Sequence, residues 1–454
     1  SHIWPHPSAA ALTALFPAGW GIYPLFKCRM QPSRLCGALF IAINGTIMRA
    51  TLYFFIKVYT LFIFYSQVRV SPSVIILCEL NNEGDDYMNW KEEVRTNITK
   101  ASGLREYMNL TDSQIEHLDK ILSQFPMTVT RYYLSLIDWD NPFCDPVFRM
   151  CIPSIEETDL SGDFDTSGEA DNTVISGLQH KYDQTALILS THRCAMYCRH
   201  CFRKRLVGIS DDETADNIEE MAAYVSQHSE ISNILISGGD AFLNSNQVIK
   251  RYLEQFSSIP HLDLIRFGTR IPVVLPMRIY DDPELLALLK TYTQKKQIYV
   301  VTQFNHPNEL TDEARKAVKA LLDSGIVVKN QTVLLKGVND SIKTLESLLK
   351  DLTRSGVIPY YIFQCRPVSG VKNQFQLPLK QGYEIVEGAK HLQNGQGKCI
   401  RYAMSHVSGK IEILGPLPDG RMLFKYHQAK YDRDKGRIFA KDLAPDQAWL
   451  DGDI

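Results

Sequence analysis

The stretch ALILSTHRCAMYCRHCFRKR, residues 186–205, decides the fold. It begins with a short apolar run, which is typical of a buried strand. It then enters a loop with three cysteines, Cys194, Cys198 and Cys201, in the spacing C-x3-C-x2-C. Parallel barrels carry their chemistry on the loops that follow their strands. The order of strand and cysteine loop therefore predicts a barrel strand that ends at a functional site.

Further apolar runs follow at regular intervals and are separated by amphipathic helical patterns. Asp282-Pro283 gives one of these helices a clear start, because proline is favoured at the first helical position. With the first strand, the runs are 186–189, 233–236, 264–267, 298–301, 327–335 and 360–363. Six β–α units in series predict parallel strands with crossover helices. No GxGxxG follows any of them, so the α/β fold class is a partial (β/α)6 TIM-like barrel rather than a dinucleotide-binding sheet.

We predict four regions along the chain. Residues 1–87 form an atypical N-terminal segment, and 88–180 a helical N-terminal extension that ends in an acidic, Gly/Ser-rich linker. The partial barrel spans 181–370. Residues 371–454 form a C-terminal region that could serve as a lid or an oligomer contact.

The first 87 residues differ in composition from the rest. Residues 1–78 contain no Asp or Glu, and 51–66 form an apolar, aromatic run with one Lys. A membrane anchor and a targeting segment both fit this composition. The interpretation that we favour is that 1–87 are disordered or not part of the working protein, with Met88 as the natural start.

Composition restricts the class of protein. The 454 residues hold 49 Lys+Arg and 51 Asp+Glu, a balance that argues against binding nucleic acid through bulk charge. Hydrophobic residues make up 45%, which is enough for a sizeable core. Ten cysteines are too few for a disulfide scaffold, and three of them lie within eight residues. This pattern indicates a metal site in a reducing compartment, so we expect a cytoplasmic protein.

Three thiolates are one ligand short of a closed tetrahedral site. A [4Fe–4S] cluster held by three cysteines leaves one iron open to a substrate or cosubstrate. The alternative is a zinc site with His192 or His200 as a fourth ligand. Ser237-Gly238-Gly239-Asp240 follows the second strand; its glycines allow close backbone approach to a ligand, although the four residues alone could form an ordinary turn.

The sequence resembles the lysine 2,3-aminomutase family of radical S-adenosylmethionine (SAM) enzymes over residues 90–414, about 70% of the chain. The shared stretches include CAMYCRHCFRKR, ILISGGD, RFGTRIPVVLPMRI, FNHPNEL, NQTVLLKGVND and PYYIFQC, in this order. The resemblance implies a radical SAM barrel and an isomerase that moves an amino group of a small amino acid. It also implies a [4Fe–4S] cluster, SAM, pyridoxal phosphate (PLP), an electron donor such as flavodoxin or ferredoxin, and a homo-oligomer.

The resemblance also assigns residues. It places the cluster on the three cysteines and SAM on Ser237, Gly238, Gly239, Asp240, Gln331 and His306, although His306 and its neighbour Asn305 could instead serve turn chemistry in Asn-His-Pro-Asn. Arg203 matches the arginine that pairs with the substrate carboxylate. For PLP the match is Lys410, with Lys181 and Tyr182 near the phosphate. The family carries R-Y-x-x-R there, and this chain has Lys181 and Thr185 in place of the two arginines.

The substrate pocket departs from the lysine-using members. They carry an Asp for the substrate ammonium where this chain has Arg366. Because an arginine repels an ammonium and attracts a carboxylate, we expect a substrate other than lysine, and Arg366 would suit an acidic amino acid. Arg366 could instead pair with a surface carboxylate. A radical SAM enzyme without PLP and a non-catalytic iron–sulfur or zinc-binding module remain alternatives.

Overall fold

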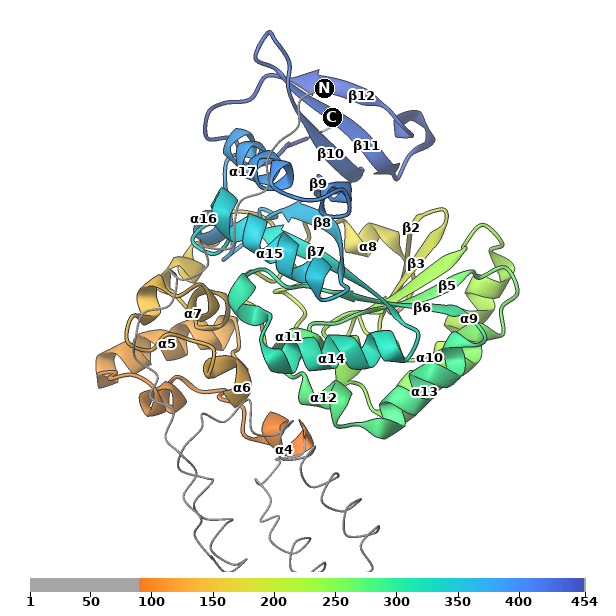
Figure 1. The fold of residues 1–454 in the computed structure, drawn as a ribbon, viewed down its shortest axis with the longest axis horizontal. Coiled ribbons are helices and arrows are strands. Elements are labelled where there is room, and N and C mark those ends of the chain that lie inside the picture. The colour runs from red at the N-terminus through yellow and green to blue at the C-terminus, as the bar shows by residue number, and fades with distance from the viewer. Residues whose placement is uncertain (1–89, 453–454) are drawn as a thin grey trace, which may run out of the picture. The chain divides into compact units, whose positions relative to one another are not determined.

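The computed structural model describes residues 90–452 (Figure 1). The three interpretations of 1–87 concern residues outside this range. Among residues 90–452, no helix has both the length and the apolar character that crossing a bilayer requires.

A run of parallel strands forms the centre of the protein, and each strand pairs with the next one along the chain. Residue pairs such as Thr185↔Asn233 fix the parallel register. The strands are β3 (Thr185–Leu189), β4 (Asn233–Ser237), β5 (Leu264–Gly268), β6 (Gln297–Thr302), β7 (Val327–Leu334) and β8 (Ile358–Gln364). All six coincide with the apolar runs, so the parallel barrel predicted from the sequence is confirmed.

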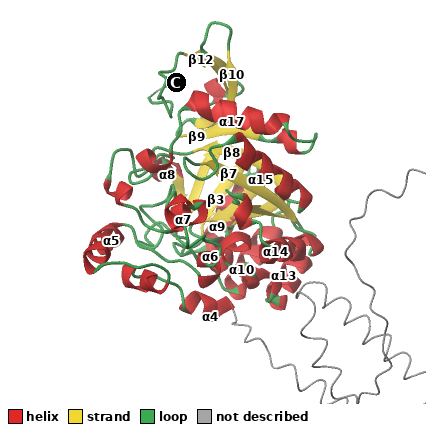
Figure 2. Ribbon diagram, turned by 60° about the vertical axis from the view of Figure 1, so that its left-hand side comes forward, coloured by secondary structure: helices red, strands yellow, loops and turns green. Residues whose placement is uncertain are grey.

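Helices connect these strands, and α13, α14 and α15 lie together on one side of them (Figure 2). The expected caps are present: the Asp282 side chain accepts from Leu285 N, and Thr311 accepts from Ala314 N. The connecting helices are α9 (Ile218–Gln227), α10 (Asn246–Ser257), α11 (Ile271–Val274), α12 (Met277–Tyr280), α13 (Pro283–Thr293), α14 (Asp312–Asp323), α15 (Ile342–Arg354), α16 (Lys372–Phe375) and α17 (Leu379–His391).

The sheet continues beyond the barrel strands at both edges. Before β3 come β1 (Thr173–Ile175) and β2 (Leu178–Tyr182), which are antiparallel. After β8 come the parallel β9 (Arg401–His406) and the antiparallel β10 (Gly409–Pro416), β11 (Met422–Ala429) and β12 (Ile438–Lys441). The result is one sheet of twelve strands in chain order, with β1 and β12 as its edges. The barrel is therefore open, and the C-terminal strands extend its wall.

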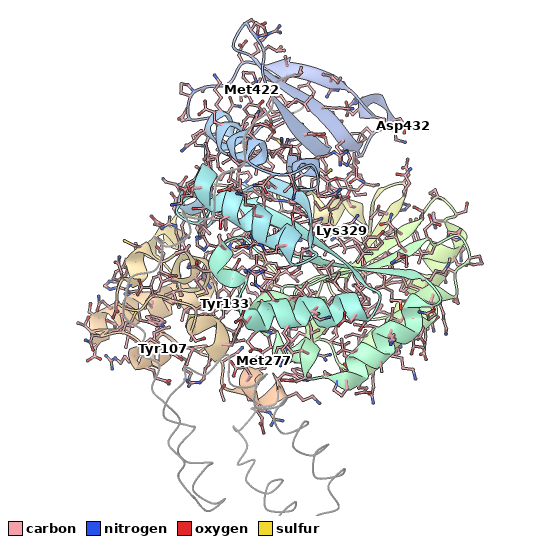
Figure 3. All side chains as sticks on the ribbon, in the orientation of Figure 1. Tyr107, Tyr133, Met277, Lys329, Met422 and Asp432 are labelled. Atoms are coloured by element: carbon pink, nitrogen blue, oxygen red, sulfur yellow. The ribbon has the colours of Figure 1, made fainter. Side chains whose placement is uncertain are left out.

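The N-terminal helices pack beside the barrel (Figure 1). They are α4 (Trp90–Arg95), α5 (Asp112–Gln124), α6 (Arg131–Leu134) and α7 (Pro146–Cys151). Thr111 and Gln114 form a capping box at the start of α5, as the sequence predicts. Tyr133 lies where these helices meet the barrel (Figure 3), and its hydroxyl donates to Glu309 Oε1 at 2.6 Å. The helices are thereby tied to the loop that follows β6.

Side chains along each barrel strand point alternately into the hydrophobic core under the helices and into the cavity inside the barrel. In β4, Ile234 and Ile236 are fully buried in the hydrophobic core. Asn233, Leu235 and Ser237, between and beside them, line an interior cavity. Successive side chains of a strand point to opposite faces, so the same strands that build the core also present polar groups inside.

Candidate active site

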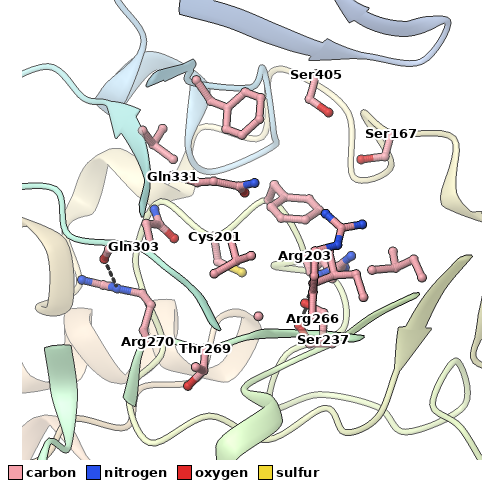
Figure 4. Close-up of a pocket in the computed structure, with 18 of the residues that line it drawn as sticks. Ser167, Cys201, Arg203, Ser237, Arg266, Thr269, Arg270, Gln303, Gln331 and Ser405 are labelled. Atoms are coloured by element: carbon pink, nitrogen blue, oxygen red, sulfur yellow. Dashed lines mark hydrogen bonds between the residues drawn. The ribbon is translucent and has the colours of Figure 1, made fainter. Parts of the chain in front are cut away.

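A cavity of about 520 Å³ lies inside the open barrel. Figure 4 shows Cys201, Arg203 and Gln331 directed into the same space. The cavity brings together all but one of the site residues predicted from the sequence: Cys194, Cys198, Cys201, Ser237, Gly238, Gly239, Asp240, Gln331, Arg203, Arg366, Lys410, Lys181 and Tyr182.

His306 is the exception. It does not line the cavity, and its Nδ1 accepts from Asn308 N at 3.2 Å. In this position it caps the short helix η6 (Pro307–Glu309). The neighbouring Asn305 is fully buried, and its Oδ1 accepts from Val333 N at 3.0 Å. The prediction that His306 contributes to the cavity is therefore corrected in favour of turn chemistry.

The cysteine loop after β3 carries three free thiols on the cavity wall. Its backbone is fixed to the N-terminal region, because Tyr197 N donates to Thr128 O and Arg199 N donates to Met150 O. Burial raises the pKa of the Cys201 thiol to about 11. Binding of iron by this thiol therefore has to displace its proton.

Two buried carboxylates hold the cations of this loop. Glu157 pairs with Arg199 at 2.5 Å and with Lys204 at 2.6 Å. Glu169 pairs with Arg203 at 2.8 Å and with Arg205 at 3.0 Å. Burial opposes the ionisation of Glu169, yet the two arginines lower its pKa to about 2. These four ion pairs fix the loop that carries the thiols.

Both carboxylates come from the segment 156–176, which the sequence suggests is a linker or surface loop. Most residues of this segment are exposed, as expected of a surface loop. It includes the short helices η4 (Ile155–Thr158) and α8 (Glu169–Asn172), and two of its carboxylates point inward: Glu157 is 0% exposed and Glu169 is 3% exposed. These two carboxylates are buried because each pairs with two cations of the cysteine loop.

The turn Ser237–Asp240 packs directly on the cysteine loop. Gly239 N donates to Thr191 O at 2.6 Å, and Asp240 N donates to Arg193 O at 2.8 Å. Gly238 has φ +103°, and a Cβ at this position would collide with Thr191 O. The two glycines thus serve the close approach of one loop to the other, in addition to facing the cavity.

The Asp240 carboxylate is already engaged in the structure. It accepts from Thr269 Oγ1 at 2.5 Å, Phe242 N at 3.0 Å and Arg270 N at 2.6 Å. The resemblance assigns this carboxylate to the amino group of SAM. In the structure its bonds from Thr269 and Arg270 hold the turn that follows β5, and its bond from Phe242 N caps the short helix η5 (Ala241–Leu243) after β4.

Arg270 is a site residue that the sequence analysis missed. Its Nη1 donates to Cys198 Sγ at 2.7 Å, and its Nη2 pairs with Glu309 at 2.5 Å. Its Nε donates to Gln303 O, the hydrogen bond drawn in Figure 4. A signal was present, because Arg270 comes directly after the third barrel strand, where barrels carry functional residues.

The cavity is strongly basic. Its lining includes two carboxylates, Glu169 and Asp240, and seven cations. Arg203 pairs with Glu169 and Arg270 with Glu309. Within residues 90–452 the other five have no carboxylate ion-pair partner: Lys181, Arg266, Lys329, Arg366 and Lys410. All five are half-buried, where cations without an ion-pair partner are only partly hydrated, so the cavity is suited to anionic ligands.

Lys410 lies near the start of β10, and its Nζ donates to Gln428 Oε1 at 2.9 Å. Its ammonium lies 5.3 Å from the centre of the Tyr361 ring. Burial, followed by the charges of Arg266 and Arg366, lowers the pKa of Lys410 to about 7. Part of its amine is therefore neutral at neutral pH, which reaction with an aldehyde requires.

Lys181 and Tyr182, at the end of β2, line the cavity near Lys410. The Lys181 ammonium donates to His406 O at 2.8 Å and to Ser167 O at 3.2 Å. Burial and then the charge of Arg366 lower the pKa of Lys181 to about 7. The two carbonyl groups thus hold Lys181, and no carboxylate among the described residues pairs with it.

Comparison with known proteins agrees with this geometry. Residues 188–349 match the model of the radical SAM superfamily. A putative L-lysine 2,3-aminomutase of Aquifex aeolicus is 40% identical over 344 residues, which are 75% of this chain and 91% of the relative. L-lysine 2,3-aminomutase of Fusobacterium nucleatum is 38% identical, over 69% of this chain and 73% of the relative. Glutamate 2,3-aminomutase of Clostridioides difficile is 36% identical, over 70% of this chain and 75% of the relative.

A radical SAM domain implies a [4Fe–4S] cluster and SAM, which favours the iron–sulfur interpretation over zinc. The three thiols that would hold the cluster lie on one cavity wall. Enzymes of this superfamily act on small molecules and typically take electrons from flavodoxin or ferredoxin. From the superfamily match, the similarity over most of the chain and the shared site, the protein belongs to the lysine 2,3-aminomutase family of radical SAM enzymes.

Proposed function

We propose that the protein is a 2,3-aminomutase that moves the α-amino group of an acidic amino acid to its β-carbon. The observation that carries this proposal is Arg366, a cavity-lining guanidinium with no carboxylate partner among the described residues. Its Nη1 is buried and makes no hydrogen bond. A buried donor without a partner costs about 1–3 kcal/mol, so a ligand carboxylate at this position would be stabilising.

The surroundings of Arg366 orient it toward such a ligand. Its Nη2 donates to Ser405 Oγ at 2.8 Å, and its guanidinium stacks 4.2 Å from the centre of the Phe202 ring. Burial lowers the pKa of Arg366 to about 10, so the side chain remains charged at neutral pH. Lysine-using members of the family carry an Asp at this position, and an arginine there repels a substrate ammonium.

Arg203 supplies the site for the other end of the substrate. Its guanidinium lies 4.5 Å from the centre of the same Phe202 ring, and Glu169 holds its Nε. Its Nη1 donates to Gly238 O at 3.3 Å and to Ser237 Oγ at 3.5 Å. Two guanidinium groups on one aromatic ring would bind the α-carboxylate and the distal carboxylate of one acidic amino acid. A relative named glutamate 2,3-aminomutase supports this substrate class.

The residues of the cavity fit the cofactors of the family. Cys194, Cys198 and Cys201 would hold the cluster, and Lys410 would attach PLP through its partly neutral amine. When bound, the cluster and SAM supply the 5′-deoxyadenosyl radical, and PLP carries the migrating amino group. The chain itself would hold both carboxylates of the substrate and enclose the reacting atoms inside the barrel.

The test is an amino-acid panel. The full-length chain, reconstituted with iron and sulfide without oxygen, is incubated with SAM, PLP and dithionite. Glutamate, aspartate, lysine and alanine are offered in turn, and products are read by mass and retention time. We expect an isomer of an acidic amino acid. The proposal would be refuted if the protein converted lysine and left the acidic amino acids unreacted.

Two variants sharpen the test. Arg366→Gln should raise KM for the acidic substrate by about tenfold or more, the loss expected for a hydrogen bond to a charged group. Arg251→Gln is the matched control, because Arg251 is exposed and pairs only on the surface with Glu219. Equal effects of the two substitutions would remove Arg366 from the substrate site. Turnover that does not require PLP or Lys410 would favour a radical SAM enzyme without PLP.

A further inference from the structure

A row of polar side chains crosses the cavity on three neighbouring strands, at the start of two of them and in the middle of the third. Thr185 begins β3, Asn233 begins β4, and Arg266 is the third residue of β5. Arg266 Nη2 donates to Asn233 Oδ1 at 2.5 Å, and Asn233 Nδ2 donates to Thr185 Oγ1 at 3.2 Å. All three residues line the cavity, and Figure 4 shows Arg266 on the same side of it as Arg203.

The guanidinium of Arg266 is only partly used by the protein. Its Nε is buried and has no hydrogen-bond partner, and no carboxylate in residues 90–452 pairs with it. A second cation, Lys329 on β7, lies between the rings of Tyr299 and Tyr360 at 4.8 and 4.7 Å. It also has no carboxylate partner in that range. Two half-buried cations without a carboxylate partner favour binding of an anion from outside the chain.

This row lies where the chain departs from its family. The family motif R-Y-x-x-R places a second arginine at the position that Thr185 occupies here. The remaining cation of the motif, Lys181, donates to the carbonyl groups of Ser167 and His406. Arg266, the first residue of the shared stretch RFGTRIPVVLPMRI, reaches Thr185 through Asn233 and supplies a positive charge on this part of the cavity wall.

Arg266 is also close to the lysine that would attach PLP. Its charge is the largest contribution after burial to the lowered pKa of Lys410, and both residues line the same cavity. A ligand attached to Lys410 could therefore place a phosphate group at Arg266. The planar guanidinium fork suits phosphate better than the single ammonium of a lysine does.

We propose that Arg266 is the principal phosphate-binding residue of the PLP site, oriented by Asn233 and Thr185, with Lys329 adding positive charge. This inference rests on the proposed use of PLP through Lys410. It departs from the expectation from resemblance, in which Lys181 and Tyr182 hold the phosphate.

The experiment compares PLP with pyridoxal, which has the same aldehyde and no phosphate. Dissociation constants of both are measured by absorbance on the full-length protein and on Arg266→Gln and Arg266→Lys. We expect Arg266→Gln to weaken PLP by about tenfold to a hundredfold, the range for a lost charged hydrogen bond, and to leave pyridoxal nearly unchanged. The affinity of Arg266→Lys for PLP should lie between those of the natural protein and of Arg266→Gln. The ratio within one variant cancels any general loss of fold or of Lys410 reactivity.

Competition by inorganic phosphate gives a second readout that does not depend on activity. Phosphate should weaken PLP binding to the natural chain and have little effect on Arg266→Gln. The phosphate assignment would be overturned if Arg266→Gln had the same ratio of PLP to pyridoxal affinity as the natural protein while attachment to Lys410 remained intact. The proposed function would not be affected by this result. If PLP does not attach to the protein, or if it attaches equally well to Lys410→Ala, the use of PLP through Lys410 is refuted.

Discussion

The reactivity of Lys410 should depend on pH in a way that the structure fixes. Burial and the charges of Arg266 and Arg366 lower its pKa from 10.5 to about 7. At pH 7 about half of the Lys410 amines would then be neutral, against roughly one in three thousand for an ordinary lysine. The neutral amine is the nucleophile, so Lys410 should react with an aldehyde about tenfold or more faster than a surface lysine at that pH, because its larger neutral fraction outweighs the lower nucleophilicity of a weaker base.

Pyridoxal is the suitable probe, because it brings no phosphate charge that would raise the pKa of Lys410. Rates of attachment are measured on the full-length chain between about pH 6 and pH 9, by absorbance and by trapping with borohydride. The rate should rise about tenfold per pH unit below pH 7 and then level off. A rate that still rises tenfold per unit near pH 9 would refute the reasoning, because Lys410 would then have an ordinary pKa.

A charge variant separates the causes of this shift. Removing a neighbouring positive charge favours the protonated amine, so Arg366→Gln should raise the pKa of Lys410 and move the plateau to higher pH. Arg251→Gln, on the surface, should leave the plateau where it is. If Arg366→Gln lowers the plateau pH or leaves it unchanged, repulsion between Arg366 and Lys410 has no part in the shift.

Three further predictions concern the cysteine loop and the substrate. Cys198→Ser leaves two thiolates, so 5′-deoxyadenosine formation from SAM should fall to background by chromatography; continued cleavage would remove the cluster assignment. Arg366→Asp should lower kcat/KM for an acidic substrate by about a hundredfold or more, because repulsion replaces attraction, and unchanged turnover would contradict the pocket. Glu157→Gln removes the charge that two buried cations share, so urea unfolding should show a loss of about 3–5 kcal/mol, whereas the exposed Glu156→Gln should cost little.

The barrel could be predicted from the sequence because its signals are local. Each parallel strand is a short apolar run, and caps such as Asp282 and Thr311 mark the following helix within a few residues. The C-terminal strands were not predicted, although residues 401–441 complete one wall of the cavity. Half-buried or exposed polar residues such as Lys410, Glu412 and Lys425 alternate there with buried apolar ones, so a search for continuous apolar runs does not find these strands.

The site residues that were missed act over long sequence distances. Glu169 lies 34 residues before Arg203, and its role becomes visible only when the cysteine loop folds back on it. Arg270 reaches Cys198 across 72 residues. Most of segment 156–176 is exposed, as its composition indicates, but composition cannot show that cations elsewhere in the chain pair with two of its carboxylates, Glu157 and Glu169, and bury them.

The distribution of these carboxylates bears on which substrate the cavity would favour. Arg203 already pairs with Glu169, which it shares with Arg205, and its Nη1 donates to Gly238 O, so the group assigned to the α-carboxylate has partners before a ligand binds. Arg366 has no such partner among the described residues, and its buried Nη1 lacks a hydrogen bond. A distal carboxylate therefore relieves a larger electrostatic cost than the α-carboxylate does. On this reasoning, shortening or neutralising the side chain of an acidic substrate should reduce binding more than changes at its α-carboxylate, which every amino acid shares.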